Sequence, residues 1–268
     1  MIRHEMKLLN GNEIAQFVKE RQAKQVRSLK QSRSTHPKLA IVKVIDDPII
    51  DMYIGLKQAY GEDIGVDVVV HKVEQSNAIK QIEELNGDDS IHGIIVQLPV
   101  EDNTQQDEIL NAVDVSKDID GLSDNSEFEP ATPMAITWLL DGYNIELVGK
   151  KVALVGRGRL VGAPLQKLLE SQGVDVDVFE KGVGELETLS SYDVVISATG
   201  EAGLIDSSML GEGAIAVDAG VATEGYKTVG DFDDSVYARD DLKVTPKKGG
   251  VGPLTVCALF ENLLRAAS

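Results

Sequence analysis

The chain has little of what several protein classes depend on. Its 268 residues include one cysteine, Cys257, so no internal disulfide can form, and we expect a reducing compartment. This cysteine lies in an apolar helical pattern, which favours a buried core position over a reactive nucleophile. No apolar run approaches the roughly 20 residues that a membrane-spanning helix needs. These scarcities argue against a disulfide-stapled secreted domain and against a helical membrane protein.

Positive charge is also scarce. Lysine and arginine number 26 against 44 aspartate and glutamate residues, which gives a formal net charge of -18. Such an acidic surface repels phosphate backbones and anionic lipids, so we expect neither nucleic acid nor a membrane as partner. The first residues show no apolar secretory segment, and Glu5 and Glu13 are unlike an acid-poor transit peptide. We therefore expect a cytoplasmic protein.

The most informative segment is a glycine-rich turn between two apolar runs. A strand pattern at 152–155 enters the turn GRGRLVG at 156–162, a helical pattern follows, and a second strand pattern at 174–179 ends in Glu180. In dinucleotide-binding domains such a turn lets the pyrophosphate approach the backbone at a helix N-terminus, and an acid after the second strand binds the ribose. The spacing G-x-G-x-x-x-G is one residue longer than the common form, and glycines also serve tight turns. The segment therefore predicts a dinucleotide site without identifying its chemistry.

Apolar patterns divide the chain into two α/β halves. The first half shows strand patterns at 39–45, 66–73 and 91–98 and helical patterns at 11–29, 52–64 and 78–85. The second shows strand patterns at 151–155, 174–179, 194–198 and 214–219 and a final helical pattern at 254–266. This alternation is typical of parallel sheets with helices on both faces. We predict an α/β protein of two α/β domains with a cleft between them, joined through the polar segment 114–133, the C-terminal domain being a Rossmann-type doubly wound parallel sheet.

Six short motifs follow the expected strands. They are YxxxK at Tyr53 and Lys57, GIIVQLP at 93–99, KDIDG at 117–121, GRGRLVGAP at 156–164, VGDFD at 229–233 and GGVGPLT at 249–255. Singly, each has an ordinary explanation: a Tyr and a Lys one helical turn apart usually pack on a surface, and Asp120 before a glycine usually forms a turn. In this order, from about residue 8 to 265, the chain strongly resembles the methylenetetrahydrofolate dehydrogenase/methenyltetrahydrofolate cyclohydrolase family, whose members are usually bifunctional.

The resemblance implies oxidation of methylene-tetrahydrofolate by hydride transfer to NAD(P) and hydrolysis of the methenyl product to formyl-tetrahydrofolate, in one-carbon metabolism and purine biosynthesis. It assigns Lys57 as general base of the hydrolysis, oriented by Gln97. It assigns Tyr53 to stacking on the folate ring and Asp120 to binding the pterin amino and ring N–H groups. A partly buried lysine beside a cationic substrate has a lowered pKa, which suits such a base. The implied folate-binding set also contains Leu98, Pro99, Gly252 and Pro253.

The implied cofactor site leaves the choice between NADP and NAD open, and no metal is expected. The site comprises Gly156, Arg157, Gly158, Gly162, Glu180, Lys181 and Val221. NADP is the usual cofactor of bacterial members with both activities, and Arg157 matches the arginine expected near its 2′-phosphate. However, Gly158 replaces the usual serine, and the pair Glu180-Lys181 replaces the usual His-Ser. These changes remove hydroxyl donors and add a negative charge that favours NAD.

Other departures lie at the edge of the folate site. Ile50 stands where the family has a serine three residues before the tyrosine, which raises the alternative of a dehydrogenase with weak or absent cyclohydrolase activity. Ala131 replaces a cysteine, and Lys247-Lys248 replace a Val-Pro pair. Two further alternatives are another two-domain dehydrogenase, acting for example on shikimate or an amino acid, and a catalytically silent dinucleotide-binding regulator on the same fold. The six ordered motifs argue against the former, and the intact catalytic set against the latter.

The resemblance also implies a domain division and an assembly. Residues 1–138 are expected to form the catalytic folate-binding α/β domain, on which the final helix at 254–268 packs back. Residues 139–253 are expected to form the Rossmann dinucleotide-binding domain. Family members are usually homodimers, so we expect a homodimer whose ligands are tetrahydrofolate derivatives and a dinucleotide.

Overall fold

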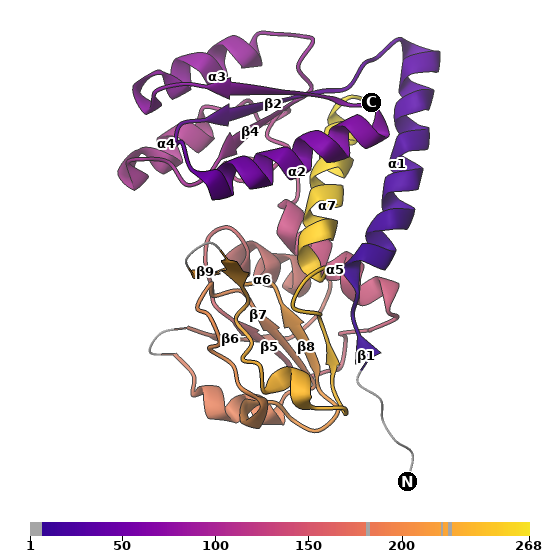
Figure 1. Cartoon of the computed structure of the whole chain (residues 1–268), viewed down its shortest axis with the longest axis vertical. Coiled ribbons are helices and arrows are strands. Elements are labelled where there is room, and N and C mark those ends of the chain that lie inside the picture. Colours follow the sequence, from indigo (N-terminus) through magenta and orange to yellow (C-terminus); the bar gives the residue numbers. More distant parts are fainter. Residues whose placement is uncertain (1–6, 181–182, 221, 225–226) are drawn as a thin grey trace. The chain divides into compact units, whose positions relative to one another are not determined.

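The computed structural model describes residues 7–180, 183–220, 222–224 and 227–268. The chain forms two compact units. The three-strand unit consists of residues 16–131 and 256–268, and the six-strand unit consists of residues 132–255 with the segment before Gln16. Figure 1 shows the helices and strands of both units with their labels.

The elements alternate along the chain as an α/β protein requires. The strands are β1 (Lys7–Leu8), β2 (Lys38–Lys43), β3 (Asp67–Lys72), β4 (Gly93–Gln97), β5 (Val152–Val155), β6 (Val176–Phe179), β7 (Val194–Ser197), β8 (Ile215–Asp218), β9 (Ala222–Glu224), β10 (Lys227–Val229) and β11 (Lys243–Val244). The α-helices are α1 (Gly11–Arg33), α2 (Pro48–Ile64), α3 (Ala78–Asn86), α4 (Gln106–Asn111), α5 (Ala131–Gly142), α6 (Gly162–Ser171) and α7 (Val251–Ala266). Five short 3₁₀ segments join them in the described chain: η1 (Gln75–Asn77), η2 (Asn103–Gln105), η3 (Leu186–Ser191), η4 (Ser207–Met209) and η5 (Val236–Ala238).

The three-strand unit is built on a parallel sheet in the order β3-β2-β4. Ile41 in β2 pairs with Val70 of β3 and Ile95 of β4, which fixes the register. Alternate residues such as Ala40 and Val42 enter one apolar core with α3 and α4. On the other face the sheet meets α2 and the C-terminal part of α7 (Figure 1). Because both faces are covered, β2 and β4 read as continuous apolar runs rather than as alternating ones.

Helix α2 carries the first of the six motifs, and its ends are set locally. The Asp47 carboxylate accepts the N–H groups of Ile49 at 2.7 Å and Ile50 at 3.2 Å and so caps the first turn. Pro48 takes the first helical position, where a missing N–H is harmless. Gly65 ends the helix with a left-handed φ of 83°, as its place after the apolar pattern predicts. The helix starts four residues before the predicted 52 because of this cap.

The six-strand unit contains a parallel sheet in the order β1-β11-β8-β7-β5-β6. Its central strands are buried on both faces. In β5, Val152 and Leu154 enter a core with α5, α6 and the start of α7. Ala153 and Val155 enter a second core, which the 3₁₀ segments η3 and η5 help to form. The two α/β domains predicted from the sequence are confirmed, with three strands in one parallel sheet and six in the other.

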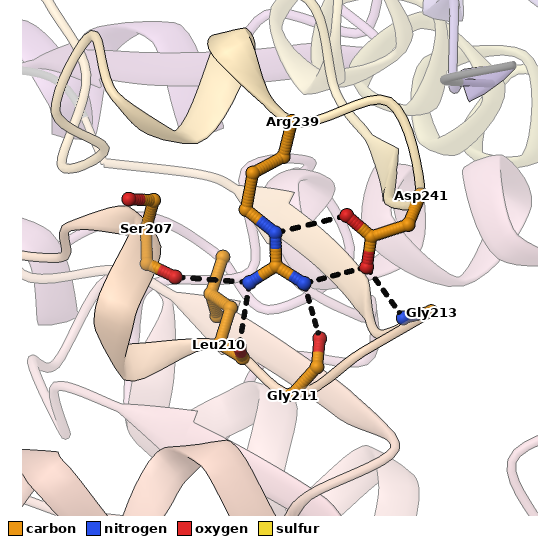
Figure 2. A network of polar contacts seen from close by, with 6 residues as sticks. All are labelled: Ser207, Leu210, Gly211, Gly213, Arg239 and Asp241. Carbon is orange, nitrogen blue, oxygen red and sulfur yellow. Dashed lines mark hydrogen bonds and ion pairs between the residues drawn. The ribbon is translucent and has the colours of Figure 1, made fainter.

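Arg239 ties together the loops before β8 in the six-strand unit (Figure 2). Its guanidinium makes a two-point ion pair with Asp241, with Nε–Oδ1 at 2.9 Å and Nη2–Oδ2 at 2.5 Å. Its remaining donors reach the backbone oxygens of Ser207 at 2.9 Å, Leu210 at 2.6 Å and Gly211 at 3.0 Å. Asp241 also accepts the N–H of Gly213 at 2.8 Å, and the Arg239 hydrogen bond is the main reason why the pKa of Asp241 falls to about 2. The network satisfies carbonyls that no regular helix or strand pairs.

Several elements were not predicted from the sequence. Helix α5 begins inside the segment expected as a polar hinge, and its Ala135, Ile136 and Leu139 are fully buried. Strands β1 and β11, which lengthen the six-strand sheet, have two residues each, and β9 and β10 form an antiparallel hairpin of three-residue strands. Segments this short carry no readable periodicity. Among the described residues, the structure contains no helix that is both long and apolar enough to cross a membrane.

Candidate active site

Tyr53 and Lys57 lie one helical turn apart on α2, and the structure joins the second of them to β4. The Lys57 ammonium donates a hydrogen bond of 2.7 Å to Oε1 of Gln97, the last residue of β4. The Gln97 amide in turn donates to the carbonyl of Leu98 at 3.0 Å, which orients its oxygen toward the lysine. Tyr53, Lys57 and Gln97 are all half-buried, so each keeps an exposed part for a ligand. Three residues predicted from two motifs therefore come from two elements of one unit that this hydrogen bond joins.

The electrostatics of this group favour an amine that loses its proton easily. Burial lowers the pKa of Lys57, and the carboxylate of Asp120 opposes that shift. Burial raises the pKa of Asp120 to about 6, against the stabilising charge of Lys57. Burial also raises the pKa of the Tyr53 phenol, which keeps it neutral. The arrangement can accept a proton at Lys57 and can bind N–H groups at Asp120.

The loop that holds Asp120 is organised by the other aspartate of KDIDG. Asp118 is buried, and its carboxylate accepts the backbone N–H of Ser123 at 2.9 Å and the Ser123 hydroxyl at 2.7 Å. From α7, the buried Asn262 amide donates to the carbonyl of Ile119 and to that of Glu129, both at 2.9 Å. These bonds hold the loop on both sides and leave Asp120 half-buried.

Asp118 and Asn262 are site-supporting residues that the sequence analysis did not single out. KDIDG contains two aspartates, and nothing in the motif says which one supports the loop. Asn262 had a weak signal, because it is a polar residue inside the apolar run VCALFENLL. A polar side chain on an apolar helix face is usually bonded to something there.

The remaining folate-site candidates lie in two places. Leu98 and Pro99 follow Gln97 and are joined by a cis peptide bond. Gly252 and Pro253 lie in the first turn of α7 and belong to the six-strand unit. Ile50, the residue in place of the family's serine, is 5% exposed in the first turn of α2.

The glycine-rich turn shows which of its glycines the backbone requires. Gly156 has φ of 94°, and a Cβ there would lie 2.7 Å from the carbonyl oxygen of Ala198. A Cβ on Gly162, the first residue of α6, would lie 2.0 Å from the oxygen of Gly156. A Cβ on Gly158 would meet no atom of the described residues within 4 Å. The first and third glycines therefore create the close approach of turn and helix that a pyrophosphate needs, and the middle one lines open space.

The residues that would distinguish the two dinucleotides flank this turn. Glu180 is exposed after β6 and forms a two-bond bridge with Val183, at 3.0 and 2.8 Å. Arg157 Nε donates to Gln166 on α6 at 3.1 Å, which ties its side chain to that helix. Lys181 and Val221, also predicted for the cofactor site, lie outside the described residues.

Two carboxylates form a clamp at the carboxyl ends of the six-strand sheet. Asp218 ends β8, and its oxygens accept the backbone N–H groups of Asp231 at 3.1 Å and Phe232 at 3.2 Å. Asp231 accepts the Ser197 hydroxyl at 2.6 Å and the Thr199 N–H at 2.7 Å, which holds the turn after β7. Burial, together with the charge of Asp231, raises the pKa of Asp218 to about 6. The clamp explains why the VGDFD motif needs its first aspartate.

No group of three or more His, Cys, Asp and Glu residues is placed to hold a metal ion in the part of the chain that the structure describes.

Family comparisons match almost the whole chain. Residues 9–120 match the catalytic domain of tetrahydrofolate dehydrogenase/cyclohydrolase, and residues 130–268 match the NAD(P)-binding domain of that family. Bifunctional protein FolD of a Nitratiruptor species is 33% identical over 276 residues, which covers 98% of both chains.

Solved structures agree over the same length. The bifunctional enzyme FolD, methylenetetrahydrofolate dehydrogenase/cyclohydrolase, from Campylobacter jejuni is 34% identical, with a TM-score of 0.91 over 98% of each chain. The methylenetetrahydrofolate dehydrogenase-cyclohydrolase of Trypanosoma brucei, solved with NADP cofactor and inhibitor, is 26% identical. It has a TM-score of 0.91 over 98% of this chain and 97% of that one.

Proposed function

The chain belongs to the tetrahydrofolate dehydrogenase/cyclohydrolase family, and from that premise we propose how its own residues perform the two reactions. It is a bifunctional methylene-tetrahydrofolate dehydrogenase and methenyl-tetrahydrofolate cyclohydrolase of one-carbon metabolism. The first reaction moves a hydride from the methylene carbon to NAD(P). The second adds water to the resulting methenyl cation and opens it to the formyl product.

For the hydrolysis, Lys57 is the general base. Its neutral amine takes a proton from the attacking water while the water oxygen bonds to the methenyl carbon. The hydrogen bond to Gln97 at 2.7 Å supports this role because it orients the amine, and burial supports it because it lowers the pKa of Lys57. This hydrogen bond is the observation that carries the proposal. Ile50 is packed inside the first turn of α2 and leaves that bond in place, so we expect hydrolysis to be retained.

The folate is bound by the groups around Lys57. Tyr53 stacks on the ring system through its exposed face, and Asp120 accepts the amino and ring N–H groups of the pterin. A carboxylate with two acceptor oxygens suits that donor pair. Leu98, Pro99, Gly252 and Pro253 complete the set.

For hydride transfer, the six-strand unit supplies the NAD(P)-binding domain. The cofactor accepts the hydride when bound, and the protein's part is to hold donor carbon and acceptor in line. The close approach at Gly156 and Gly162 and the N-terminus of α6 fit a pyrophosphate. Arg157, Gly158, Glu180, Lys181 and Val221 complete the cofactor set.

On cofactor choice, we propose a weakened preference for NADP and a gain for NAD. Glu180 supports this because an exposed carboxylate binds a ribose diol and repels a 2′-phosphate. The measurement is kcat/KM with each cofactor at saturating folate. A strong NADP preference, of about 100-fold or about 2.7 kcal/mol, would contradict the proposal.

The catalytic assignment is tested by replacing one lysine. Lys57→Met should lower the hydrolysis rate by at least about 100-fold and reduce hydride transfer much less, because only the hydrolysis needs a base. Lys80→Met on α3 is the matched control, since that lysine is exposed in the same unit. Hydrolysis retained in Lys57→Met would remove Lys57 from the mechanism.

The domain functions and the assembly follow from the same membership. We propose that residues 1–138 with the final helix 254–268 form the folate domain and residues 139–253 the dinucleotide domain. We propose a cytoplasmic homodimer. Light scattering coupled to size exclusion tests the dimer, and a monomer mass at working concentrations would contradict it.

A further inference from the structure

Lys43, the last residue of β2, is a buried charge that the two reactions above do not use. It is 6% exposed, whereas every other lysine whose burial the structure describes is at least partly exposed. Its ammonium forms an ion pair with Asp51 and a second with Asp46, at 3.2 Å from Asp46 Oδ1. The hydrogen bond to Asp51 is the main reason why the pKa of Lys43 is raised, so the side chain stays charged. A lysine is rarely buried unless its charge is paired, and here two aspartates pair it.

The position of Lys43 in the sheet places it beside the catalytic group. Lys43 pairs with Lys72 on β3 and with Gln97 on β4, so the three residues form one row across the carboxyl end of the sheet. Paired residues of parallel strands present their side chains on the same face, and adjacent strands lie about 4.8 Å apart. Gln97 holds Lys57 from this row. Lys43 is therefore the strand neighbour of the residue that orients the base.

The same row is joined to α2 at two points. Lys43 binds Asp51 in the first turn of α2, and Gln97 binds Lys57 further along. The two attachment points are six residues apart, or about 9 Å along the helix axis, and Tyr53 lies between them. These two side-chain links hold the segment 51–57 of α2, which carries Tyr53 and Lys57, against the sheet.

The charges of this cluster balance only while Lys43 is present. Asp46 is shared between Lys43 and Lys72, the latter at 2.5 Å, and Asp51 is held by Lys43. Asp46 and Lys72 are mostly exposed, with side-chain exposures of 63% and 66%. Removing Lys43 leaves one excess negative charge in this cluster, whereas removing Asp51 leaves one excess positive charge.

We propose that Lys43 is a positioning residue for the cyclohydrolase site: it anchors the first turn of α2 and neutralises Asp46 and Asp51 beside the catalytic amine of Lys57. The proposal rests on Lys57 being the base. Other groups also surround Lys57 and its helix. Asp120 from the 117–121 loop and Tyr53 on α2 lie near Lys57 itself. Further along α2, the groups around Tyr60 come from α7 and α1 and are Cys257, Glu261, Arg21 and Lys19. The variants below leave all of these unchanged.

The test measures the pKa of Lys57 directly, together with the pH dependence of hydrolysis. Full-length protein is labelled at lysine Cε with ¹³C and titrated by NMR, the Lys57 signal being assigned by its loss in Lys57→Arg. Lys43→Met should raise the pKa of Lys57, and with it the acid limb of the hydrolysis profile, by about half a pH unit. Hydrolysis on that limb then falls about threefold, since the unprotonated fraction falls tenfold per unit below the pKa.

Two further variants make the result specific. Asp51→Asn should shift both readouts by a similar amount in the opposite direction, because it leaves a positive charge. Lys72→Met also removes one positive charge from this row, but one strand further from Gln97 and in solvent, where charges are screened. It should therefore shift the pKa of Lys57 and the acid limb of the hydrolysis profile by less than about 0.2 unit. Lys43→Arg, which keeps the charge, should restore the parent profile. Should Lys43→Met fail to fold, Asp51→Asn decides, since Asp51 is exposed and Lys43 keeps its ion pair with Asp46 in that variant.

The outcomes separate this proposal from the assignment of the base. If the pKa of Lys57 does not move in Lys43→Met or in Asp51→Asn, the proposed role of Lys43 is wrong. It is also wrong if Lys72→Met shifts that pKa as much as Lys43→Met does, or if Lys43→Met and Asp51→Asn shift it in the same direction. A pKa that moves as expected while the hydrolysis profile stays fixed supports the coupling and contradicts Lys57 as the base.

Discussion

The Asp120 carboxylate and the Lys57 amine oppose the effect of burial on each other. Burial lowers the pKa of Lys57 and raises that of Asp120 to about 6, and in each case the partner's charge acts against the shift. The charges of the two groups are thus coupled although 63 positions separate them in the sequence. Changing either one must alter the other.

Replacing Asp120 should move the hydrolysis profile toward lower pH. Asp120→Asn removes the negative charge that stabilises the protonated form of Lys57, so the pKa of Lys57 falls and its neutral form persists at lower pH. The pH-rate profile measures this, as the position of its acid limb. Folate affinity should fall in the same variant, because an amide cannot replace both acceptor oxygens. A limb that moves to higher pH would contradict the coupling of the two residues.

The glycine turn offers a matched pair of substitutions. Gly158→Ser places its side chain in open space, so the variant should fold like the parent protein. Its hydroxyl should raise kcat/KM with NADP by about tenfold, the effect of one hydrogen bond to a phosphate of about 1.4 kcal/mol. Gly162→Ala should instead weaken binding of both cofactors and destabilise the protein by about 2 kcal/mol or more, because its Cβ would lie 2.0 Å from a carbonyl oxygen. If the two substitutions had equal effects on stability and on cofactor use, the different roles assigned to Gly158 and Gly162 would be wrong.

Arg239 should be among the more costly polar residues to replace. Arg239→Met removes the donors of three backbone carbonyls and the partner of Asp241, and we expect a loss of about 2–4 kcal/mol in urea unfolding at pH 7. The pKa of Asp241 is lowered from 3.8 to about 2, so its ion pair stabilises the fold above pH 4 and this stabilisation is lost as pH falls toward 2. The difference between parent and variant should therefore shrink between pH 4 and pH 2. A difference that is constant over this range would contradict a role for the Asp241 charge.

Removing the charge of Asp231, unlike removing that of Arg239, should not lower the stability of the fold. Its Oδ1 is buried and meets no donor from the described residues, while Oδ2 accepts two hydrogen bonds. Asp231→Asn keeps an oxygen for those two donors and removes a charge that raises the pKa of Asp218. We expect the asparagine variant to be as stable as the parent or about 1 kcal/mol more stable at pH 8, with a smaller difference below pH 5, where Asp218 is protonated.

The alanine variant is the control for that change. Asp231→Ala leaves the Ser197 hydroxyl and the Thr199 N–H without their acceptor, so it should lose about 2–3 kcal/mol. Chemical unfolding of both variants at pH 5 and pH 8 decides the matter. A destabilised asparagine variant would mean that the Asp231 charge is required.

Much of the architecture could be predicted because the strands carry strong local signals. The apolar runs at β2, β4, β5 and β7 are buried on both faces, and Gly65 ended α2 as its position predicted. The elements that were not predicted lack a clear apolar pattern in the sequence. Helix α5 mixes threonines with its apolar residues and begins in a polar segment, so its sequence shows no clear helical pattern, and the two-residue strands β1 and β11 are too short to show one.

The sequence by itself determined the family and the two reactions, since six motifs in one order identify the chemistry without coordinates. Only the tertiary structure distinguished the structural roles of particular residues in and beside these motifs. It showed that Asp118 supports the loop that carries Asp120, that Gly162 is required where Gly158 is not, and that a lysine at the end of β2 adjoins the residue that orients Lys57. The physical reason is distance. Burial, hydrogen bonds and charge coupling act over a few ångströms in space, and the residues concerned lie tens of positions apart in the chain.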